Sequence, residues 1–222
     1  MMIKICGMRE EENIAAVASL TPMLMGFIFH EASPRDASLL NPDAVKSLPP
    51  FVRPVAVFVD KDDEYISEVC DRYGIHIIQL HGAESPEQCR RLKSKGFTVF
   101  KAIGIENSQD LQNLAIYDGV VDMFLFDTKS SCHGGTGKKF DWQLLESYDL
   151  ETPYLLSGGI DAGDINNIIK AMRPGMAGID INSRFETSPG IKDISKLVNF
   201  ILSLRKFNEH EPDTTPFWEK KI

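Results

Sequence analysis

The 222-residue sequence predicts an α/β fold, a single (β/α)₈ TIM barrel, and three observations support this prediction. Short apolar, β-branched runs alternate with amphipathic stretches about eight times along the chain. The alternation is spread evenly, which indicates one barrel domain over residues 1–207 and a polar extension over residues 208–222. The first apolar run also lacks the GxGxxG turn that a doubly wound nucleotide-binding sheet, the main alternative fold, normally carries.

The apolar runs are the expected strands, and the amphipathic stretches between them are the expected helices. Strands are expected over residues 3–6, 23–29, 55–59, 75–80, 98–102, 123–127, 154–156 and 177–180. Helices are expected over residues 10–19, 42–47, 62–73, 86–95, 108–117, 141–147, 161–172 and 193–207. Asn41-Pro42 and Ser85-Pro86 are typical of helix starts, and Gly74 and Gly96 are typical of left-handed helix ends.

The composition narrows the function classes. The chain carries 24 basic and 32 acidic residues, a formal net charge of −8, and no strong basic run, so no nucleic-acid partner is expected. No apolar stretch approaches the roughly 20 residues that cross a bilayer, and the N-terminus has no signal-peptide layout, so no membrane partner is expected. The four cysteines, at positions 6, 70, 89 and 132, form no CxxC pair. This spacing predicts a cytoplasmic protein without a zinc site or a disulfide framework, in which Cys70 and Cys89 are ordinary small residues.

In a barrel of this kind, function is located where the strands run into the loops that follow them. The polar residues at these strand ends are Cys6, His30, Asp60, Gln79, His81, Lys101, Asp127, Ser157 and Asp180. Side chains two residues apart on a strand face the same way. By this rule the side chains that enter one common mouth are those of Lys4, Cys6, Gln79, His81, Asp127, Asp180 and Asn182. A buried carboxylate without a task is costly, which favours a functional Asp127, whereas an ion pair with Asp180 would make Lys4 structural.

Glycine-rich loops at neighbouring strand ends predict a phosphate site. One loop, residues 130–138, follows the sixth strand, and Ser157-Gly158-Gly159-Ile160 follows the seventh. Loops after the seventh and eighth strands form the usual phosphate site of this architecture, because backbone N–H groups freed by small residues can surround an anion. The expected phosphate-binding residues are Gly135, Gly137, Gly158, Gly159, Asn182, Ser183 and Arg184.

Taken in chain order, these motifs resemble the phosphoribosylanthranilate isomerases. The matching segments are Lys4-Ile5-Cys6-Gly7, Gln79-Leu80-His81-Gly82, Asp127 with Gly134-Gly135-Thr136-Gly137 and Phe140-Asp141-Trp142, Ser157-Gly158-Gly159-Ile160, and Gly178-Ile179-Asp180. They cover nearly all of the chain except the tail. The first segment together with the second is the most specific part of the resemblance.

The resemblance implies an intramolecular oxidoreduction of tryptophan biosynthesis, the Amadori rearrangement of N-(5-phosphoribosyl)anthranilate to 1-(2-carboxyphenylamino)-1-deoxyribulose 5-phosphate. It implies no cofactor and no metal, and the expected partner is a small phosphorylated substrate, with the chain a monomer or a homodimer. The implied roles are general base for Cys6, general acid for Asp127, binding of the anthranilate carboxylate for Arg35, and substrate contact for His81, Asp180 and, on the same strand face as His81, Gln79. Arg184 departs from the pattern, since many members have a glycine there, and it either contacts the phosphate or points to solvent.

Both members of the implied catalytic pair need an unusual protonation state. An exposed aspartate is mostly ionised at neutral pH, so Asp127 needs partial burial to keep its proton. A thiol with a pKa of about 8.5 is roughly 3% thiolate at pH 7. Forming the Cys6 thiolate at that pH therefore costs about 2 kcal/mol, and the positive charge of the nearby Lys4 would reduce this cost.

Three other functions stay open at the level of sequence. An aminoimidazole carboxamide ribotide isomerase would carry an aspartate where this chain has Cys6. A Schiff-base aldolase would use Lys101, at the end of the fifth strand. A non-catalytic phosphate-binding barrel would keep its function when Cys6 or Asp127 is replaced.

Overall fold

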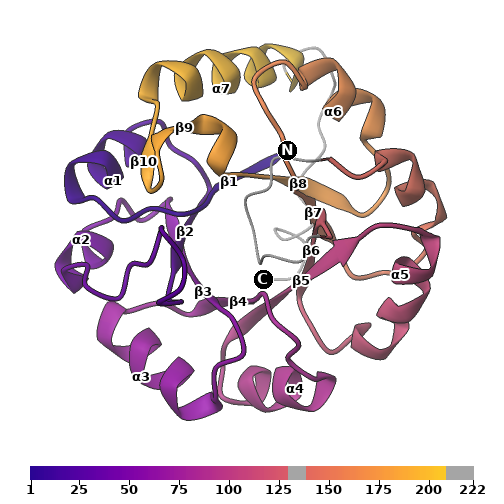
Figure 1. Ribbon diagram of the computed structural model, residues 1–222, viewed down its shortest axis with the longest axis horizontal. Helices are drawn as coiled ribbons and strands as arrows, with labels where there is room; N and C mark the ends of the chain where they lie inside the picture. Colours follow the sequence, from indigo (N-terminus) through magenta and orange to yellow (C-terminus); the bar gives the residue numbers. More distant parts are fainter. Residues whose placement is uncertain (130–138, 209–222) are drawn as a thin grey trace.

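A computed structural model describes residues 1–129 and 139–208 of the chain. Eight parallel strands close into a barrel in the order β1 to β8, and helices form a ring around it (Figure 1), which confirms the predicted (β/α)₈ fold. The barrel strands are β1 (Met2–Ile5), β2 (Leu24–Ile28), β3 (Arg53–Phe58), β4 (Ile77–Leu80), β5 (Thr98–Ile105), β6 (Met123–Thr128), β7 (Tyr154–Leu156) and β8 (Met176–Ile181).

The helices follow the predicted positions with two kinds of difference. The α-helices of the described residues are α1 (Glu11–Ala18), α2 (Pro42–Lys46), α3 (Asp63–Tyr73), α4 (Pro86–Ser94), α5 (Ser108–Gln112), α6 (Ile165–Ala171) and α7 (Ile194–Asn208). After α5 the chain tightens into the 3₁₀ helix η1 (Asn113–Tyr117), and the short predicted helix over residues 141–147 is also a 3₁₀ helix, η2 (Trp142–Ser147). The predicted helix start at residue 161 is too early, because Asp164 accepts a hydrogen bond from the Asp161 amide and folds the segment into a turn (2.7 Å).

The helix ends use the predicted chemistry. The Ser85 side chain accepts a hydrogen bond from the Gln88 amide at the start of α4, and Asn41 accepts one from the Asp43 amide at the start of α2. Gly74 ends α3 with a φ of 68°, and Gly96 follows α4 with a φ of 95°. Both values lie in the left-handed region that glycine adopts without steric cost.

Two hydrophobic cores result from the alternation of side chains along the strands. The core inside the barrel is small and comprises Met2, Leu24, Val55, Ile77, Phe100, Ala102, Met123, Leu125 and Leu155. The larger core lies between the barrel and the helices and includes Ile5, Phe124 and Phe126, as the strand parity predicts. Because the inner core fills the barrel from the N-terminal ends of the strands, the next inward-facing residues of each strand are left for polar side chains at the opposite end.

An additional antiparallel hairpin, not foreseen from the sequence, follows β8. The chain passes through the 3₁₀ helix η3 (Ser183–Phe185) into β9 (Glu186–Ser188) and returns as β10 (Ile191–Lys192). Gly190 turns the hairpin with a φ of 87°. Asn13 of α1 fastens its end, since the Asn13 side chain accepts from the Lys192 amide at 2.8 Å and donates to the Lys192 carbonyl at 3.0 Å.

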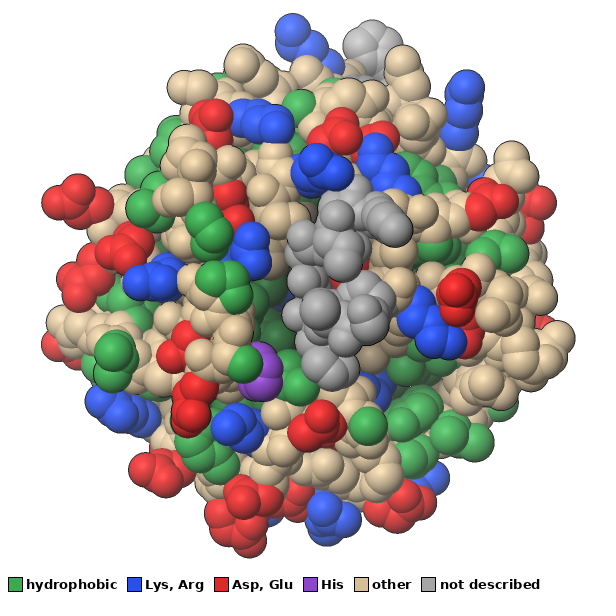
Figure 2. All heavy atoms as spheres, in the orientation of Figure 1, with side chains coloured by type: hydrophobic (Ala, Val, Ile, Leu, Met, Phe, Trp, Pro, Cys, Tyr) green, Lys and Arg blue, Asp and Glu red, His purple; other side chains and the backbone are tan. Residues whose placement is uncertain are grey.

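The last described helix, α7, ends one residue beyond the predicted domain limit at 207. The division into a barrel and a tail over residues 208–222 stays a prediction, because residues 209–222 lie outside the described part of the chain. No helix in residues 1–129 and 139–208 combines the length and the apolar character needed to cross a membrane. Around the rim of the barrel, acidic and basic side chains are intermixed (Figure 2).

We predict that two buried thiols make the stability of the barrel fall at alkaline pH. Burial raises the pKa of Cys70 to about 12 and that of Cys89 to about 11, whereas a cysteine of the unfolded chain titrates near about 8.5. Below the unfolded pKa this contribution to stability is complete, and it is lost as the pH rises toward the folded values. Urea unfolding between about pH 8 and 11 should therefore show a steeper decline for the wild type than for Cys70→Ala/Cys89→Ala. Equal slopes would contradict the prediction.

Candidate active site

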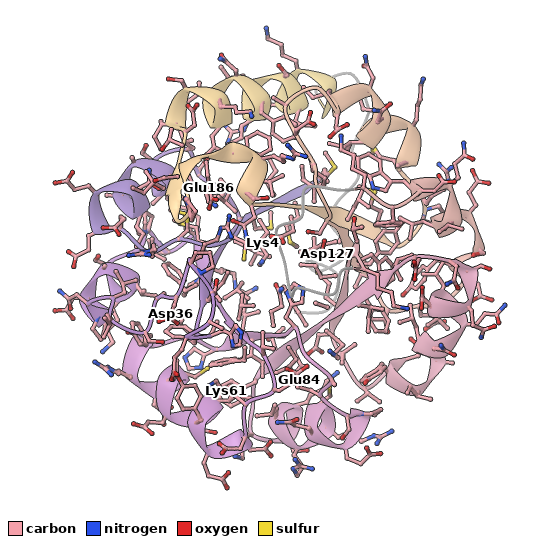
Figure 3. All side chains as sticks on the ribbon, in the orientation of Figure 1. Lys4, Asp36, Lys61, Glu84, Asp127 and Glu186 are labelled. Atoms are coloured by element: carbon pink, nitrogen blue, oxygen red, sulfur yellow. The ribbon has the colours of Figure 1, made fainter. Side chains whose placement is uncertain are left out.

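Polar side chains form a layer above the inner core, at the C-terminal ends of the strands. Figure 3 shows Lys4 and Asp127 inside the ring of strands, whereas Glu84 and Lys61 lie farther out, toward the helices. The inward-facing polar residues belong to five strands, β1, β4, β6, β7 and β8, or directly follow one of them. They are Lys4, Cys6, Gln79, His81, Asp127, Ser157 and Asp180. Strand parity thus brings together six of the seven side chains predicted to share one mouth, and the seventh, Asn182, accepts a hydrogen bond from Lys192 Nζ.

A buried ion pair joins the first strand to the last. Lys4 of β1 and Asp180 of β8 are register partners, and Lys4 Nζ lies 2.9 Å from Asp180 Oδ1. The Ser157 hydroxyl donates to the other carboxylate oxygen of Asp180, at 3.3 Å. Burial acts to lower the pKa of Lys4, but the charge of Asp180, together with that of Cys6 when it is a thiolate, outweighs burial and raises that pKa. Lys4 is therefore a permanent buried cation, in the ion pair that the sequence analysis considered for it.

Cys6 follows β1 directly and is 4% exposed. Its amide donates to the Ile181 carbonyl of β8 at 2.9 Å, which fixes its backbone against the closing strand. Burial raises the pKa of the Cys6 thiol, and the ammonium groups of Lys4 and Lys192 oppose that rise without cancelling it. The expectation that Lys4 reduces the cost of forming the thiolate is right in direction, but desolvation is the larger effect.

Glycine at position 26 makes room for the Cys6 thiol. A Cβ atom at Gly26, in the middle of β2, would stand 2.6 Å from Cys6 Sγ and 3.1 Å from Cys6 Cα. Both separations are far below the normal contact distance between such atoms, which is about 3.5–4.0 Å for two carbons. The sequence analysis missed Gly26, although a glycine inside an apolar strand signals a close approach.

Asp127, His81 and Gln79 form a second polar group across the mouth. Gln79 is buried, and its Nε2 lies 3.1 Å from His81 Nδ1. The direction of this hydrogen bond depends on the tautomer of His81, and so on the proton of its other ring nitrogen, Nε2. That nitrogen lies 3.6 Å from Asp127 Oδ2, and the other oxygen, Oδ1, accepts from the Thr128 amide at 2.7 Å.

The loop after β7 packs directly against Asp127. Gly158 and Gly159 have φ values of 85° and 66°. A Cβ at Gly158 would stand 2.5 Å from Thr128 Oγ1 and 3.2 Å from Asp127 Oδ1. Within the described residues, no hydrogen bond engages the amide of either glycine. Two successive amides in this conformation form a concave surface suited to an anion.

Arg35 lies on the opposite side of the mouth, in a cluster that includes the hairpin. Its Cδ would stand 2.7 Å from a Cβ at Gly7, the residue after Cys6. Its guanidinium forms a bidentate pair with Glu186, with Nε 3.0 Å from Oε1 and Nη2 2.7 Å from Oε2. Glu186 also contacts Lys192, whose Nζ lies 2.6 Å from Oε1 and 2.7 Å from the Asn182 side-chain oxygen. The sequence analysis missed Glu186 and Lys192, although Pro189-Gly190 between two short runs is a turn signal.

Of the remaining residues predicted to bind phosphate, the structure describes Ser183 and Arg184 but not Gly135 and Gly137. Ser183 begins the 3₁₀ helix η3, and the side chain of Arg184 is exposed. Gly135 and Gly137 lie outside the described residues. Among residues 1–129 and 139–208, no three His, Cys, Asp or Glu side chains are grouped so as to hold a metal ion.

Lys101 lies outside the mouth, which disfavours the aldolase alternative. Its neighbours Phe100 and Ala102 face the inner core, so Lys101 points toward the helices. Its buried Nζ lies 3.0 Å from Glu84 Oε2 and 2.7 Å from the Gly82 carbonyl oxygen. Glu84 in turn accepts from the amides of Asp60 and Gly82. The pair therefore braces the loops after β3 and β4, including the one that follows His81.

A family model described as N-(5'phosphoribosyl)anthranilate (PRA) isomerase matches residues 3–203, which is most of the chain.

The chain belongs to the phosphoribosylanthranilate isomerase family.

Relatives and solved structures of the phosphoribosylanthranilate isomerase family agree with this assignment. A protein of Phocaeicola vulgatus with that name is 44% identical over 206 residues, covering 93% of this chain and 98% of the relative. One of Parabacteroides distasonis is 45% identical over 203 residues, covering 90% and 92%. The crystal structure of the Thermotoga maritima isomerase has a TM-score of 0.80 at 31% identity, covering 93% of this chain and 99% of that one. A structure in complex with reduced 1-(o-carboxyphenylamino)-1-deoxyribulose 5-phosphate has a TM-score of 0.79 at 30% identity, with the same two coverages.

We predict that Gly26→Ala lowers isomerase activity more than it lowers stability. The added Cβ displaces Cys6 Sγ, and a misplacement of about 1 Å can cost about a hundredfold in rate. Gly96→Ala is the matched control, because it strains a left-handed residue with no atom within 4 Å of the new Cβ. The control should lose thermal stability and keep its kcat. Wild-type activity in Gly26→Ala would show that the packing of Cys6 against β2 has no role in catalysis.

Proposed function

We propose that this chain isomerises N-(5'-phosphoribosyl)anthranilate to 1-(2-carboxyphenylamino)-1-deoxyribulose 5-phosphate, a step of tryptophan biosynthesis, with Cys6 as base and Asp127 as acid. The observation that carries the proposal is the placement of Cys6 and Asp127 in one barrel mouth, after β1 and on β6, in a chain of this family. A thiol and a carboxyl group on different strands can reach different atoms of one bound sugar.

Asp127 performs the first step in this proposal. The protonated carboxyl group gives its proton to the furanose ring oxygen, the bond between that oxygen and C1 breaks, and the nitrogen lone pair forms an iminium ion. Asp127 Oδ1 is held by the Thr128 amide, and Oδ2 faces His81 Nε2. His81, which Gln79 Nε2 contacts at 3.1 Å, lies beside the reacting oxygen of Asp127, and we propose that it positions that oxygen.

Cys6 performs the second step. Its thiolate removes the proton from C2 of the iminium ion, which gives a neutral enolamine. The enolamine becomes the ketone when the Cys6 thiol returns its proton to C1 and the Asp127 carboxylate takes the proton of the C2 hydroxyl. Asp127 is then protonated again, and Cys6 is the thiolate with which these steps began. The proton that the Cys6 thiol of the empty site gives up to solvent before it acts as the base returns from solvent after product release, so no atoms are gained or lost.

The raised pKa of the free Cys6 thiol fits this order of steps. In the empty site, burial favours the neutral thiol over the thiolate. The iminium ion places a positive charge next to the proton that is removed, and that charge favours the thiolate at the moment it is needed. Ring opening by Asp127 therefore has to come before deprotonation by Cys6.

Protein contacts are proposed for both ends of the substrate, the anthranilate carboxylate and the phosphate. Arg35, beside Gly7, would bind the anthranilate carboxylate, and Asp180 would face the sugar through Oδ2, which within the protein accepts only a 3.3 Å hydrogen bond from Ser157 among the described residues. The phosphate would lie on the amides of Gly158 and Gly159, near Asn182 and Ser183. Contacts from Gly135, Gly137 and Arg184 stay predictions.

The assembly state and the location are also proposals. The relative from Thermotoga maritima is described as a dimer from which monomers were generated, so both predicted states occur in this family. We keep monomer and homodimer as alternatives. The free thiols of Cys6, Cys70 and Cys89 support the proposed cytoplasmic location.

We predict that Cys6→Ala and Asp127→Asn each lower kcat/KM for phosphoribosylanthranilate by about a hundredfold or more, the usual contribution of a general acid or base. Consumption of the fluorescent substrate measures the rate, and circular dichroism checks that the fold survives. Cys70→Ala removes a thiol from the outer core and should keep its activity.

Two results would overturn the proposed function. A wild-type protein that leaves phosphoribosylanthranilate unconsumed is not this isomerase. If the wild type is active and both variants retain activity within about tenfold, the acid and base are wrongly assigned.

A further inference from the structure

Two side chains of the β9–β10 hairpin have no role in the mechanism above: Glu186, which holds Arg35, and Lys192, which contacts Glu186. Glu186 and Lys192 are buried, with side-chain exposures of 4% and 0%. Glu186 grips the Nε and Nη2 edge of Arg35, and within the described residues no hydrogen bond reaches the third nitrogen, Nη1. The Glu186 contact therefore leaves the other edge of the guanidinium for a ligand (Figure 3 labels Glu186).

Anchoring the hairpin does not explain the charge of Lys192. The hairpin end is fastened to Asn13 through the backbone amide and carbonyl of residue 192, which any residue type supplies. The turn is closed by the Gly190 amide, which donates to Glu186 Oε1 at 3.1 Å. Burying an ammonium group costs free energy, so a fully buried lysine whose side chain does not fasten the hairpin to α1 points to a need for its charge.

The charges of Arg35, Glu186 and Lys192, taken together, explain why a charged residue stands at position 192. Arg35 and Glu186 alone would be a neutral pair, with little attraction for an incoming carboxylate. Lys192 adds a second cation, so that two cations and one anion leave a net charge of +1 while Lys192 is protonated. Burial lowers the pKa of Lys192, and the Glu186 carboxylate, 2.6 Å away, opposes that fall. Burial acts to raise the pKa of Glu186, but Arg35 and Lys192 outweigh it and hold that pKa below its usual range. Lys4 and Asp180 next to this cluster cancel one another.

We propose that Glu186 and Lys192 form a positioning unit for Arg35, in which Glu186 aims the guanidinium and Lys192 cancels the charge of Glu186. Arg35 thereby presents a net positive charge to the benzoate carboxylate of the substrate. This inference rests on the proposed function, because it takes Arg35 as the partner of that carboxylate. Lys192 and Glu186 are positioning residues, since they act through Arg35.

The test compares two ligands that differ only in the carboxylate. One is reduced 1-(2-carboxyphenylamino)-1-deoxyribulose 5-phosphate, and the other is its phenylamino counterpart without the carboxylate. In Lys192→Met, calorimetry should show the Kd of the first ligand rising about tenfold or more, the worth of one charged contact. The Kd of the second ligand should change by less than about twofold. Lys192 also faces Cys6 electrostatically, so binding is a cleaner readout than kcat.

A charge-balance rescue separates positioning from mere packing. Glu186→Gln/Lys192→Met leaves Arg35 as the only charge of the cluster and restores the net charge of +1. It should bind the carboxylate ligand within about threefold of the wild type, although it carries one more substitution than Lys192→Met. Replacing both partners of a buried ion pair is tolerated better than removing one. The double variant thus keeps the test available if Lys192→Met does not fold.

Equal weakening of both ligands in Lys192→Met would overturn the inference, and so would a double variant that binds the carboxylate ligand as poorly as Lys192→Met. These results are distinguishable from failure of the proposed function. If the wild-type protein binds neither ligand, the proposed function is wrong. If it binds both and the variants do not discriminate between them, only the role of Lys192 and Glu186 is wrong.

Discussion

The ion pair between Lys4 and Asp180 is the interaction on which the rest of the structure depends. It joins β1 to β8, the two strands that close the barrel, at the level where the apolar core ends and the polar mouth begins. Removing one partner of such a pair typically costs about 3–5 kcal/mol, because the other charge is left buried and alone. Closure of the barrel and the electrostatics of its mouth therefore rest on the same two side chains.

The position and the protonation of Cys6 depend on the junction between β1 and β8, called the β1–β8 seam below. The Cys6 amide continues the pairing of β1 with β8, and Gly26 on the other side leaves space for its thiol. The surroundings are dry enough to favour the thiol and hold two cations that favour the thiolate. This balance suits a base that acts only after a positive charge has formed on the substrate. A second unit of opposite charges, Lys192 with Glu186, contacts Arg35 through Glu186, and we propose that it positions Arg35 for the carboxylate end of the substrate.

The sequence predicts those features that depend on local periodicity. Strand parity correctly separates Asp127, which faces the mouth, from Phe124 and Phe126, which pack under the helices. Contacts between distant segments are different, because periodicity carries no information about which loops meet. The contact of Arg35 with Glu186, which are 151 residues apart, and the fit of Cys6 against Gly26 depend on barrel closure. The net direction of the Cys6 pKa was equally out of reach, since it depends on how deeply the thiol is buried.

The central claim is that the buried cation of the β1–β8 seam favours the thiolate of Cys6. The most direct test is the pH dependence of iodoacetamide alkylation at Cys6 in Lys4→Met/Asp180→Asn, a variant that removes both charges and leaves neither partner alone. Because the thiolate is the reacting species, the midpoint of this profile reports the thiol pKa. The account predicts a midpoint above that of the wild type, because Lys4 lowers the pKa of Cys6 more than Asp180 raises it, with the barrel still folded by circular dichroism. An unchanged or lower midpoint in a folded variant would contradict it.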